Sequence, residues 1–223
     1  MSSRKSTVQA DPSSSSEKDS TTMGLKAVHP PTQQVADYTH RPRLLLLTWL
    51  VISVPLVAWD TLYVHLRPLT MPGGKLHSPI WTPYALYGSV DYIYGWPAWD
   101  AHNGFTAAQS AMNIPESAFY CWYLYIVARQ VADWSSKGFS KLEVRGEGVS
   151  LAVLLALLGA VMTVSKTLLY GLNEYYSGFA GVGHNPWYLL ISLWIIPNGL
   201  WIVVPSYMTY VLGQEILGFM NGA

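Results

Sequence analysis

The chain has 223 residues, 13 basic and 13 acidic side chains, 51% hydrophobic residues and 13% aromatic residues. This apolar content is too high for an ordinary soluble surface and indicates a one-domain membrane protein. The net charge of zero and the lack of a basic stripe argue against nucleic acid as a partner. A single cysteine leaves neither a disulfide framework nor a cysteine metal site available.

The N-terminal region is polar. Residues 1–40 hold a serine run at 13–16, scattered charges, two adjacent prolines and almost no apolar periodicity. This composition is typical of disorder, so we predict a disordered cytoplasmic tail over 1–40 followed by a membrane domain over 41–223. The core of a signal peptide does not precede Leu44, and the first membrane helix is expected to direct insertion into the endoplasmic reticulum.

Four segments are long enough to cross a bilayer, which takes about 20 mostly apolar residues. They are 44–66, 105–134, 149–171 and 187–212. The second starts with small and polar residues, which predicts that its first half faces protein. The expected fold class is an all-α integral membrane protein, a four-helix transmembrane bundle with a disordered tail.

The distribution of lysine and arginine predicts the orientation, because positively charged loops stay in the cytoplasm. The residues before the first span include six of these, and the loop after the second span holds four, counting Arg129. The first loop has only Arg67 and Lys75, and the third loop has none. Both termini are therefore expected in the cytoplasm, with loops 67–104 and 172–186 in the lumen.

Three ionisable residues, Asp60, Glu116 and Lys166, fall inside separate predicted spans. Bulk lipid would penalise each charge by at least a few kcal/mol, so they are expected to face the bundle interior. A helical rise of 1.5 Å per residue predicts that all three converge on a pocket in the lumenal half. Gln109 and Asn113 precede Glu116 at spacings that place the three side chains on one helical stripe.

Lys166 has two interpretations. It could be the counter-ion of Asp60 or Glu116 or a buried proton carrier, or its long side chain could reach the lumenal headgroups. Pairing with Asp60 would keep that carboxylate ionised as a base and leave Glu116 as the acid.

The lumenal segment 84–102 is rich in aromatic side chains, among them Tyr94, Trp96 and Trp99, and it carries Asp91 and Asp100. Tryptophan and tyrosine are favoured at the membrane interface. The segment could be a lid over the pocket or an interfacial anchor, and the sequence favours neither.

Residues 170–205 carry a pattern of tyrosine, glutamate, an aromatic residue near glycine, a Gly-His turn with proline, and an Asn-x-Leu-Trp-x-x-x-Pro helix. This segment resembles the last helical hairpin of the emopamil-binding protein family of sterol Δ8-Δ7 isomerases, which contain the EXPERA domain. The matching positions are Tyr170, Glu174, Phe179, Gly183, His184, Pro186, Asn198, Leu200, Trp201 and Pro205.

Upstream, the resemblance is weaker and covers the chain from about 44 to 212. It rests on Glu116 followed by serine, on the segment 59–64 with its aspartate among aromatics, and on Tyr94-Gly95, Asp100 and Phe105-Thr106. The family usually has five helices, and the resemblance implies that the first of them has no counterpart among the four predicted spans. Leu56 stands where the family has a histidine one turn before its acidic residue.

The resemblance implies that Glu116 and Asp60 move protons to and from a double bond. It also implies that Asn198 orients groups by hydrogen bonding and that Trp201 offers a π face to a carbocation. Further candidates for substrate binding are Asn113, Tyr170 and Lys166. No cofactor or metal is expected, the partners are a hydrophobic small molecule and the bilayer, and a homodimer is left open.

Three functions remain open at this point. The first is a cofactor-free membrane isomerase or cyclase acting on a sterol or terpenoid-like substrate. Because the histidine is absent, a related terpenoid or polyketide-terpenoid reaction is at least as well supported as the sterol reaction. The second is a non-catalytic sterol-binding or lipid-binding protein. The third, suggested only by the polar tail, is a scaffold for another membrane enzyme.

Overall fold

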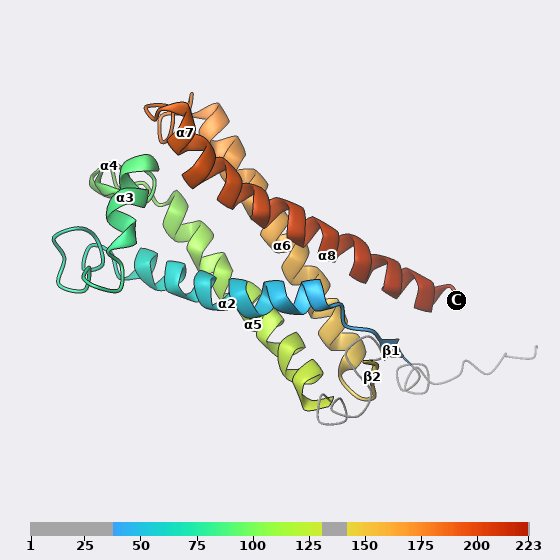
Figure 1. Ribbon diagram of the computed structural model, residues 1–223. Coiled ribbons are helices and arrows are strands. Elements are labelled where there is room, and N and C mark those ends of the chain that lie inside the picture. Colours follow the sequence, from blue (N-terminus) through green and yellow to red (C-terminus); the bar gives the residue numbers. More distant parts are fainter. Residues whose placement is uncertain (1–37, 131–141, 223) are drawn as a thin grey trace, which may run out of the picture. The chain divides into compact units, whose positions relative to one another are not determined.

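The computed structural model describes residues 38–130 and 142–222. It is mostly helical, with the long helices α2, α5 and α6 followed by a last helical stretch formed by α7, η3 and α8 (Figure 1). Helix α5 packs against α2 and α6, and α6 also packs against α8. The elements are β1 Thr39–His40, α2 Leu44–His65, α3 Pro83–Val90, α4 Trp96–Asp100, α5 Phe105–Gln130, β2 Val144–Arg145, α6 Val149–Tyr176, α7 Trp187–Leu189, the π-helix η3 Leu190–Ile195 and α8 Ile196–Met220.

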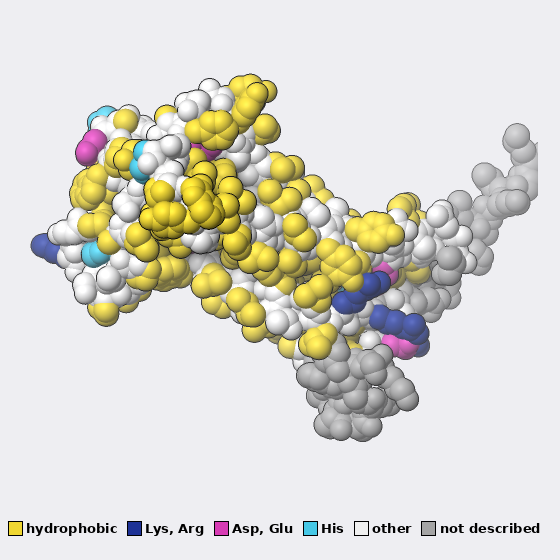
Figure 2. Space-filling model, turned by 45° about the horizontal axis from the view of Figure 1, so that its top comes forward, with side chains coloured by type: hydrophobic (Ala, Val, Ile, Leu, Met, Phe, Trp, Pro, Cys, Tyr) yellow, Lys and Arg dark blue, Asp and Glu magenta, His cyan; other side chains and the backbone are white. Residues whose placement is uncertain are grey.

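Three helical segments in the described part are long and apolar enough to cross a membrane, namely α2, α6 and Trp187–Met220. Many large hydrophobic side chains are exposed on these helices. Figure 2 shows hydrophobic side chains spread over the middle of one face, with charged side chains toward its two ends. These features indicate a multi-pass protein in a lipid bilayer.

Helix α5, the second predicted span, is not among those three segments. It has 26 residues, but its first half contains Thr106, Ser110, Asn113 and Glu116, all of them buried. These polar side chains lower its hydropathy, and they face protein as the small and polar start of the segment predicts.

Two helices extend beyond the predicted spans. Helix α6 continues to Tyr176 instead of ending at 171, and α8 continues to Met220 instead of 212. Hydropathy marks only the part of a helix that matches the hydrocarbon, whereas the helix itself continues into the interfacial region. Residues 131–134 of the second predicted span lie outside the described residues.

The start of α2 and the end of α8 are joined by a polar cluster. Strands β1 and β2 pair antiparallel, so the fold is not entirely α-helical. Tyr38 donates a hydrogen bond to Glu215 Oε1 at 2.7 Å, and His40 hydrogen-bonds to Glu215 at 2.7 Å and to the Tyr123 hydroxyl at 2.8 Å. Tyr38 and His40 are buried, so the last residues of the predicted 1–40 tail belong to the folded domain, while 1–37 lie outside the described residues.

Candidate functional site

A cavity of about 460 Å³ lies between α2, α3, α5, α6 and the η3–α8 segment. Small-molecule sites typically have about 300–1,000 Å³, so the volume suits a compact organic ligand. Its wall is mostly apolar and aromatic, with a few polar groups. Six of the seven predicted site residues line it: Asp60, Asn113, Lys166, Tyr170, Asn198 and Trp201.

Glu116, the seventh predicted residue, does not line this cavity. Its side chain is buried and borders a separate small hollow that it shares with Trp201. The two predicted acids therefore have different surroundings. Asp60 faces the cavity, whereas Glu116 lies behind Lys166.

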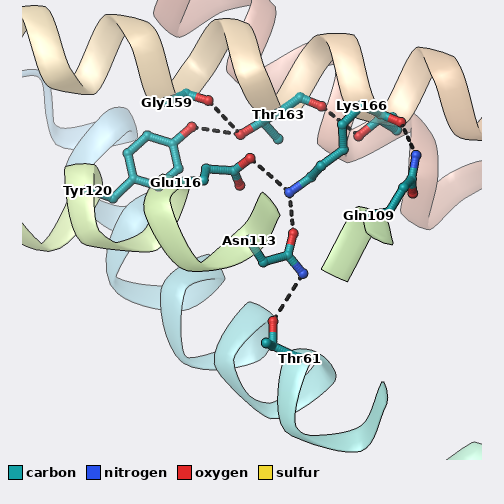
Figure 3. Close-up of polar contacts among 9 residues, drawn as sticks. Thr61, Gln109, Asn113, Glu116, Tyr120, Gly159, Thr163 and Lys166 are labelled. Atoms are coloured by element: carbon teal, nitrogen blue, oxygen red, sulfur yellow. Dashed lines mark hydrogen bonds and ion pairs between the residues drawn. The ribbon is translucent and has the colours of Figure 1, made fainter. Parts of the chain in front are cut away.

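Lys166 explains the position of Glu116. Its ammonium group forms an ion pair with Glu116 Oε2 at 2.8 Å and donates a hydrogen bond to Asn113 Oδ1 (Figure 3). Asn113 in turn donates to Thr61 Oγ1 at 3.1 Å, and Gln109 donates to the Lys166 carbonyl oxygen at 2.7 Å. The stripe of Gln109, Asn113 and Glu116 thus meets α6 at one residue, Lys166.

This arrangement decides between the interpretations of Lys166. Its side chain is 17% exposed and is held by α5, so it does not extend toward the headgroups. Its salt-bridge partner is Glu116. The alternative in which Lys166 pairs with Asp60 and leaves Glu116 as the acid is not the arrangement in the structure.

Asp60 is held by two tyrosines from segment 84–102. Tyr84 donates to Asp60 Oδ1 at 2.6 Å and Tyr94 donates to Oδ2 at 3.4 Å. Burial raises the pKa of both phenols well above the usual range, so they keep their protons and act as donors. Tyr63 stacks on Tyr84 with ring centroids 3.7 Å apart. An acid with fixed donors and an aromatic surround therefore faces the cavity.

Segment 84–102 contributes directly to the cavity wall. Tyr84, Tyr87 and Tyr94 line it, and α3 covers the side of the cavity next to Asp60. The segment is thus part of the site, which agrees with a covering role more than with an interfacial anchor. Sequence reasoning singled out Tyr94 but missed Tyr84 and Tyr87, because only the fold places them beside Asp60.

Asp91 was named only as an acidic residue of the loop, yet it is fully buried and connects three parts of the fold. It accepts hydrogen bonds from the Tyr170 hydroxyl, from Trp194 Nε1 at 3.1 Å and from the Ile93 backbone N–H at 3.1 Å. Burial raises its pKa to about 6. Asp91 therefore positions Tyr170 in the cavity wall, a role for which the sequence offers no separate signal.

Asn198 and Trp201 lie where the π-helix meets α8. Pro197 lacks a backbone N–H, and the turn before it is π-helical, a form often found at functional sites. The Asn198 side chain donates to the Trp194 carbonyl oxygen at 2.8 Å. Trp201 contacts Trp49 edge to face, with centroids 4.9 Å apart. Both residues still line the cavity.

Within the described ranges, no group of three or more His, Cys, Asp or Glu side chains could hold a metal ion. The fold and site define a class: a helical membrane protein whose internal cavity carries a carboxyl group and an ammonium group. Comparison with family models, with curated proteins and with solved structures finds no match for this chain. Membership of the emopamil-binding protein family stays a prediction from the sequence.

Proposed function

We propose that the protein is a cofactor-free membrane isomerase or cyclase that moves protons on a sterol-like or terpenoid-like substrate. The observation that carries this proposal is the Asp60 carboxyl, which faces an aromatic cavity of about 460 Å³ and is held by two phenol donors. A carboxyl group with this access can exchange a proton with a bound ligand. Asp60 is then the catalytic acid or base.

The predicted role of Glu116 changes in this proposal. Because its carboxylate contacts Lys166 and not the cavity, it acts as a positioning residue that holds the ammonium group at the wall. Asn198, Trp201 and Tyr170 form the surface against which the apolar substrate lies.

We also propose four membrane crossings in the endoplasmic reticulum, with both termini in the cytoplasm. Pairing of β1 with β2 places the starts of α2 and α6 at the same end of the domain. If α2 crosses the bilayer, α5 has to return the chain before α6 begins. The contacts of Glu215 with Tyr38 and His40 place the end of α8 at that same end.

Proton transfer can be tested without knowing the natural substrate. Membranes from yeast that lack their own sterol Δ8-Δ7 isomerase and express this chain are incubated in heavy water with a panel of unsaturated sterols and terpenoids. Mass spectrometry then measures the deuterium incorporated into each compound. We expect incorporation with the wild type and its loss in Asp60→Asn. Asp100→Asn, which changes an exposed aspartate of α4, is the matched control.

The alternative is a non-catalytic sterol-binding or lipid-binding protein. It is favoured by the Lys166–Glu116 ion pair, which leaves Asp60 as the cavity's single facing carboxyl among the lining residues. This alternative predicts that well-expressed protein binds a sterol without incorporating deuterium. Equal incorporation in wild type and Asp60→Asn would instead remove Asp60 from the mechanism. The scaffold hypothesis depends on a tail of which residues 1–37 lie outside the described residues.

A further inference from the structure

The wall between α5 and α6 forms a polar patch in an otherwise aromatic and apolar cavity. Five lining residues make this patch: Gln109, Ser110, Asn113, Lys166 and Thr167. A ligand in the cavity has to match both the apolar surface and this patch. The hydrogen bonds already made within the patch therefore indicate which chemical group the ligand brings to it.

Several donors of the patch are already used within the protein. Gln109 donates to the Lys166 carbonyl at 2.7 Å, Asn113 donates to Thr61 at 3.1 Å, and Thr167 donates to the Thr163 carbonyl at 2.8 Å. Lys166 has three N–H donors, of which the described residues accept two, through Glu116 and Asn113. One N–H remains for a ligand, as does one on each of the Gln109 and Asn113 amides, but only the Lys166 donor carries a positive charge.

Ser110 supplies a second donor at the same wall. It is 3% exposed, and its hydroxyl oxygen has no hydrogen-bond partner among the described residues. A helical serine commonly donates to the carbonyl four residues earlier, but Ser110 does not. Leaving a buried hydroxyl unpaired is unfavourable, and rotation about its Cα–Cβ bond can turn it toward a ligand oxygen.

The charge at the wall selects the type of intermediate. Lys166 lines the cavity while its partner Glu116 lies behind it, so the positive end of the ion pair faces the ligand. A cation at this position repels a developing carbocation and stabilises a developing oxyanion. Asp60 is close to the same patch, because Asn113 bonds both to Lys166 and to Thr61, the neighbour of Asp60.

We propose that the cavity takes a sterol-sized or terpenoid-sized β,γ-unsaturated ketone and shifts its double bond into conjugation through a dienolate. This inference rests on the proposed function, whose substrate and intermediate it names. The ketone oxygen lies at Lys166 and Ser110, and the carbon between the carbonyl and the double bond lies at Asp60.

The reaction needs no co-reactant. The Asp60 carboxylate removes a proton from the α-carbon, and the electron pair of the C–H bond delocalises onto the ketone oxygen. The Lys166 N–H and the Ser110 hydroxyl donate hydrogen bonds to that oxyanion. Asp60 then returns the proton to the γ-carbon, the carbonyl re-forms, and the double bond is conjugated with it. Nothing is oxidised or reduced.

The test uses the purified full chain in detergent micelles, with a β,γ-unsaturated steroid ketone as the probe. The rise in ultraviolet absorbance of the conjugated product reports turnover above the rate in micelles alone. We expect turnover by the wild type and none by Asp60→Asn. Removing one oxyanion donor typically lowers kcat by about 10²–10³-fold, and we expect such a loss in the double variant Lys166→Met/Glu116→Gln. Ser110→Ala should lower kcat with little change in KM.

Two variants distinguish the loss of a hydrogen-bond donor from general damage to the fold. The double variant removes both charges of the pair, so no unpaired charge is left to prevent folding. Ser192→Ala makes the Ser110 change at an exposed serine and should be neutral. A fluorescent steroid phenol, which mimics the dienolate, should bind the wild type at least tenfold more tightly than the double variant.

The outcomes distinguish this inference from the proposed function. Turnover of the ketone that is unchanged in Lys166→Met/Glu116→Gln would overturn the oxyanion role. Deuterium incorporation into other substrates that depends on Asp60, without turnover of the ketone, would overturn the inference and leave the proposed function standing. Failure of both assays with folded protein would overturn both.

Discussion

Lys166 and Glu116 form an ion pair in which neither side chain has full access to water. Their side chains are 17% and 2% exposed, and Asn113 provides a further acceptor for the ammonium group. Burial of two charges is compensated only when the geometry is good and the remaining donors find partners. Removing one member of such a pair therefore harms the protein more than removing both.

We predict that Glu116→Ala lowers the free energy of unfolding by about 3–5 kcal/mol, because it leaves the Lys166 ammonium group buried without its counter-ion. The double variant Lys166→Met/Glu116→Gln should recover most of this loss. Denaturant unfolding in detergent micelles, followed by tryptophan fluorescence, measures all three proteins. Equal destabilisation by the single and double variants would contradict an energetic coupling between the two side chains.

Asp91 predicts a pH dependence of stability. Burial raises its pKa from 3.8 to about 6, so the folded protein favours the protonated carboxyl more than the unfolded chain does. The stabilisation is present in full below about pH 4 and is lost as pH rises to about 6, an effect of about 3 kcal/mol for this residue. Above that pH its contribution is constant.

The variant Asp91→Asn isolates this effect. Asparagine keeps an acceptor for Tyr170 and Trp194 but does not titrate. Thermal unfolding between pH 4 and pH 7 should show a steeper fall of stability for the wild type than for Asp91→Asn. Parallel curves for the two proteins would show that Asp91 titrates alike in the folded and unfolded states.

At the scale of elements, α5 and α6 come close together at a glycine. A Cβ atom added to Gly159 would lie 2.8 Å from Cε1 of Tyr120, which is too close for an unshifted ring. That ring is held in place, because the Tyr120 hydroxyl hydrogen-bonds to Thr163 Oγ1 at 2.8 Å and Thr163 donates to the Gly159 carbonyl at 2.9 Å. The close packing of α5 against α6 thus depends on the absence of a side chain at Gly159.

We predict opposite effects for the same substitution at two glycines of α6. Gly159→Ala should lower the free energy of unfolding by about 1–3 kcal/mol through overpacking against Tyr120. Gly171 has open space around the position of an added Cβ, so Gly171→Ala should raise stability by about 0.5–1 kcal/mol through its better helix propensity. Thermal unfolding of both variants in one detergent checks this. A stabilised Gly159→Ala would show that Tyr120 can move.

At the scale of the whole molecule, the number of membrane crossings determines on which side of the membrane each loop lies. The sequence contains no Asn-x-Ser/Thr acceptor for N-glycosylation. Engineered acceptors can therefore report on each loop separately. With four crossings, acceptors placed between α2 and α3 and between α6 and α7 should be glycosylated in microsomes. Acceptors placed between α5 and α6 and after α8 should not be.

A three-crossing topology would give another pattern. If α5 does not cross, the loop between α2 and α3 and the loop between α5 and α6 lie on one side and are modified together. That result would contradict both the four-crossing proposal and the strand pairing that places the starts of α2 and α6 at one end.

Much of the fold follows from local sequence properties. Hydropathy gave the start of α2 and of α6 and the start of the last helical stretch, because long apolar runs leave few alternatives to a membrane helix. Hydropathy predicted the ends of α6 and α8 less accurately, because the helical turns beyond the hydrocarbon need not be apolar. The strand pair was missed, because two-residue strands have no periodicity to detect.

The sequence by itself determined that Asp60, Glu116 and Lys166 lie toward the interior, since lipid disfavours their charges whatever the fold. It also determined the stripe of Gln109, Asn113 and Glu116, because helical spacing alone aligns them. Only the tertiary structure decided that Lys166 pairs with Glu116, that Asp60 faces the cavity, and that Tyr84 and Asp91 belong to the site. Those contacts depend on helix rotation and on the path of segment 84–102, which are set by packing between elements far apart in the chain.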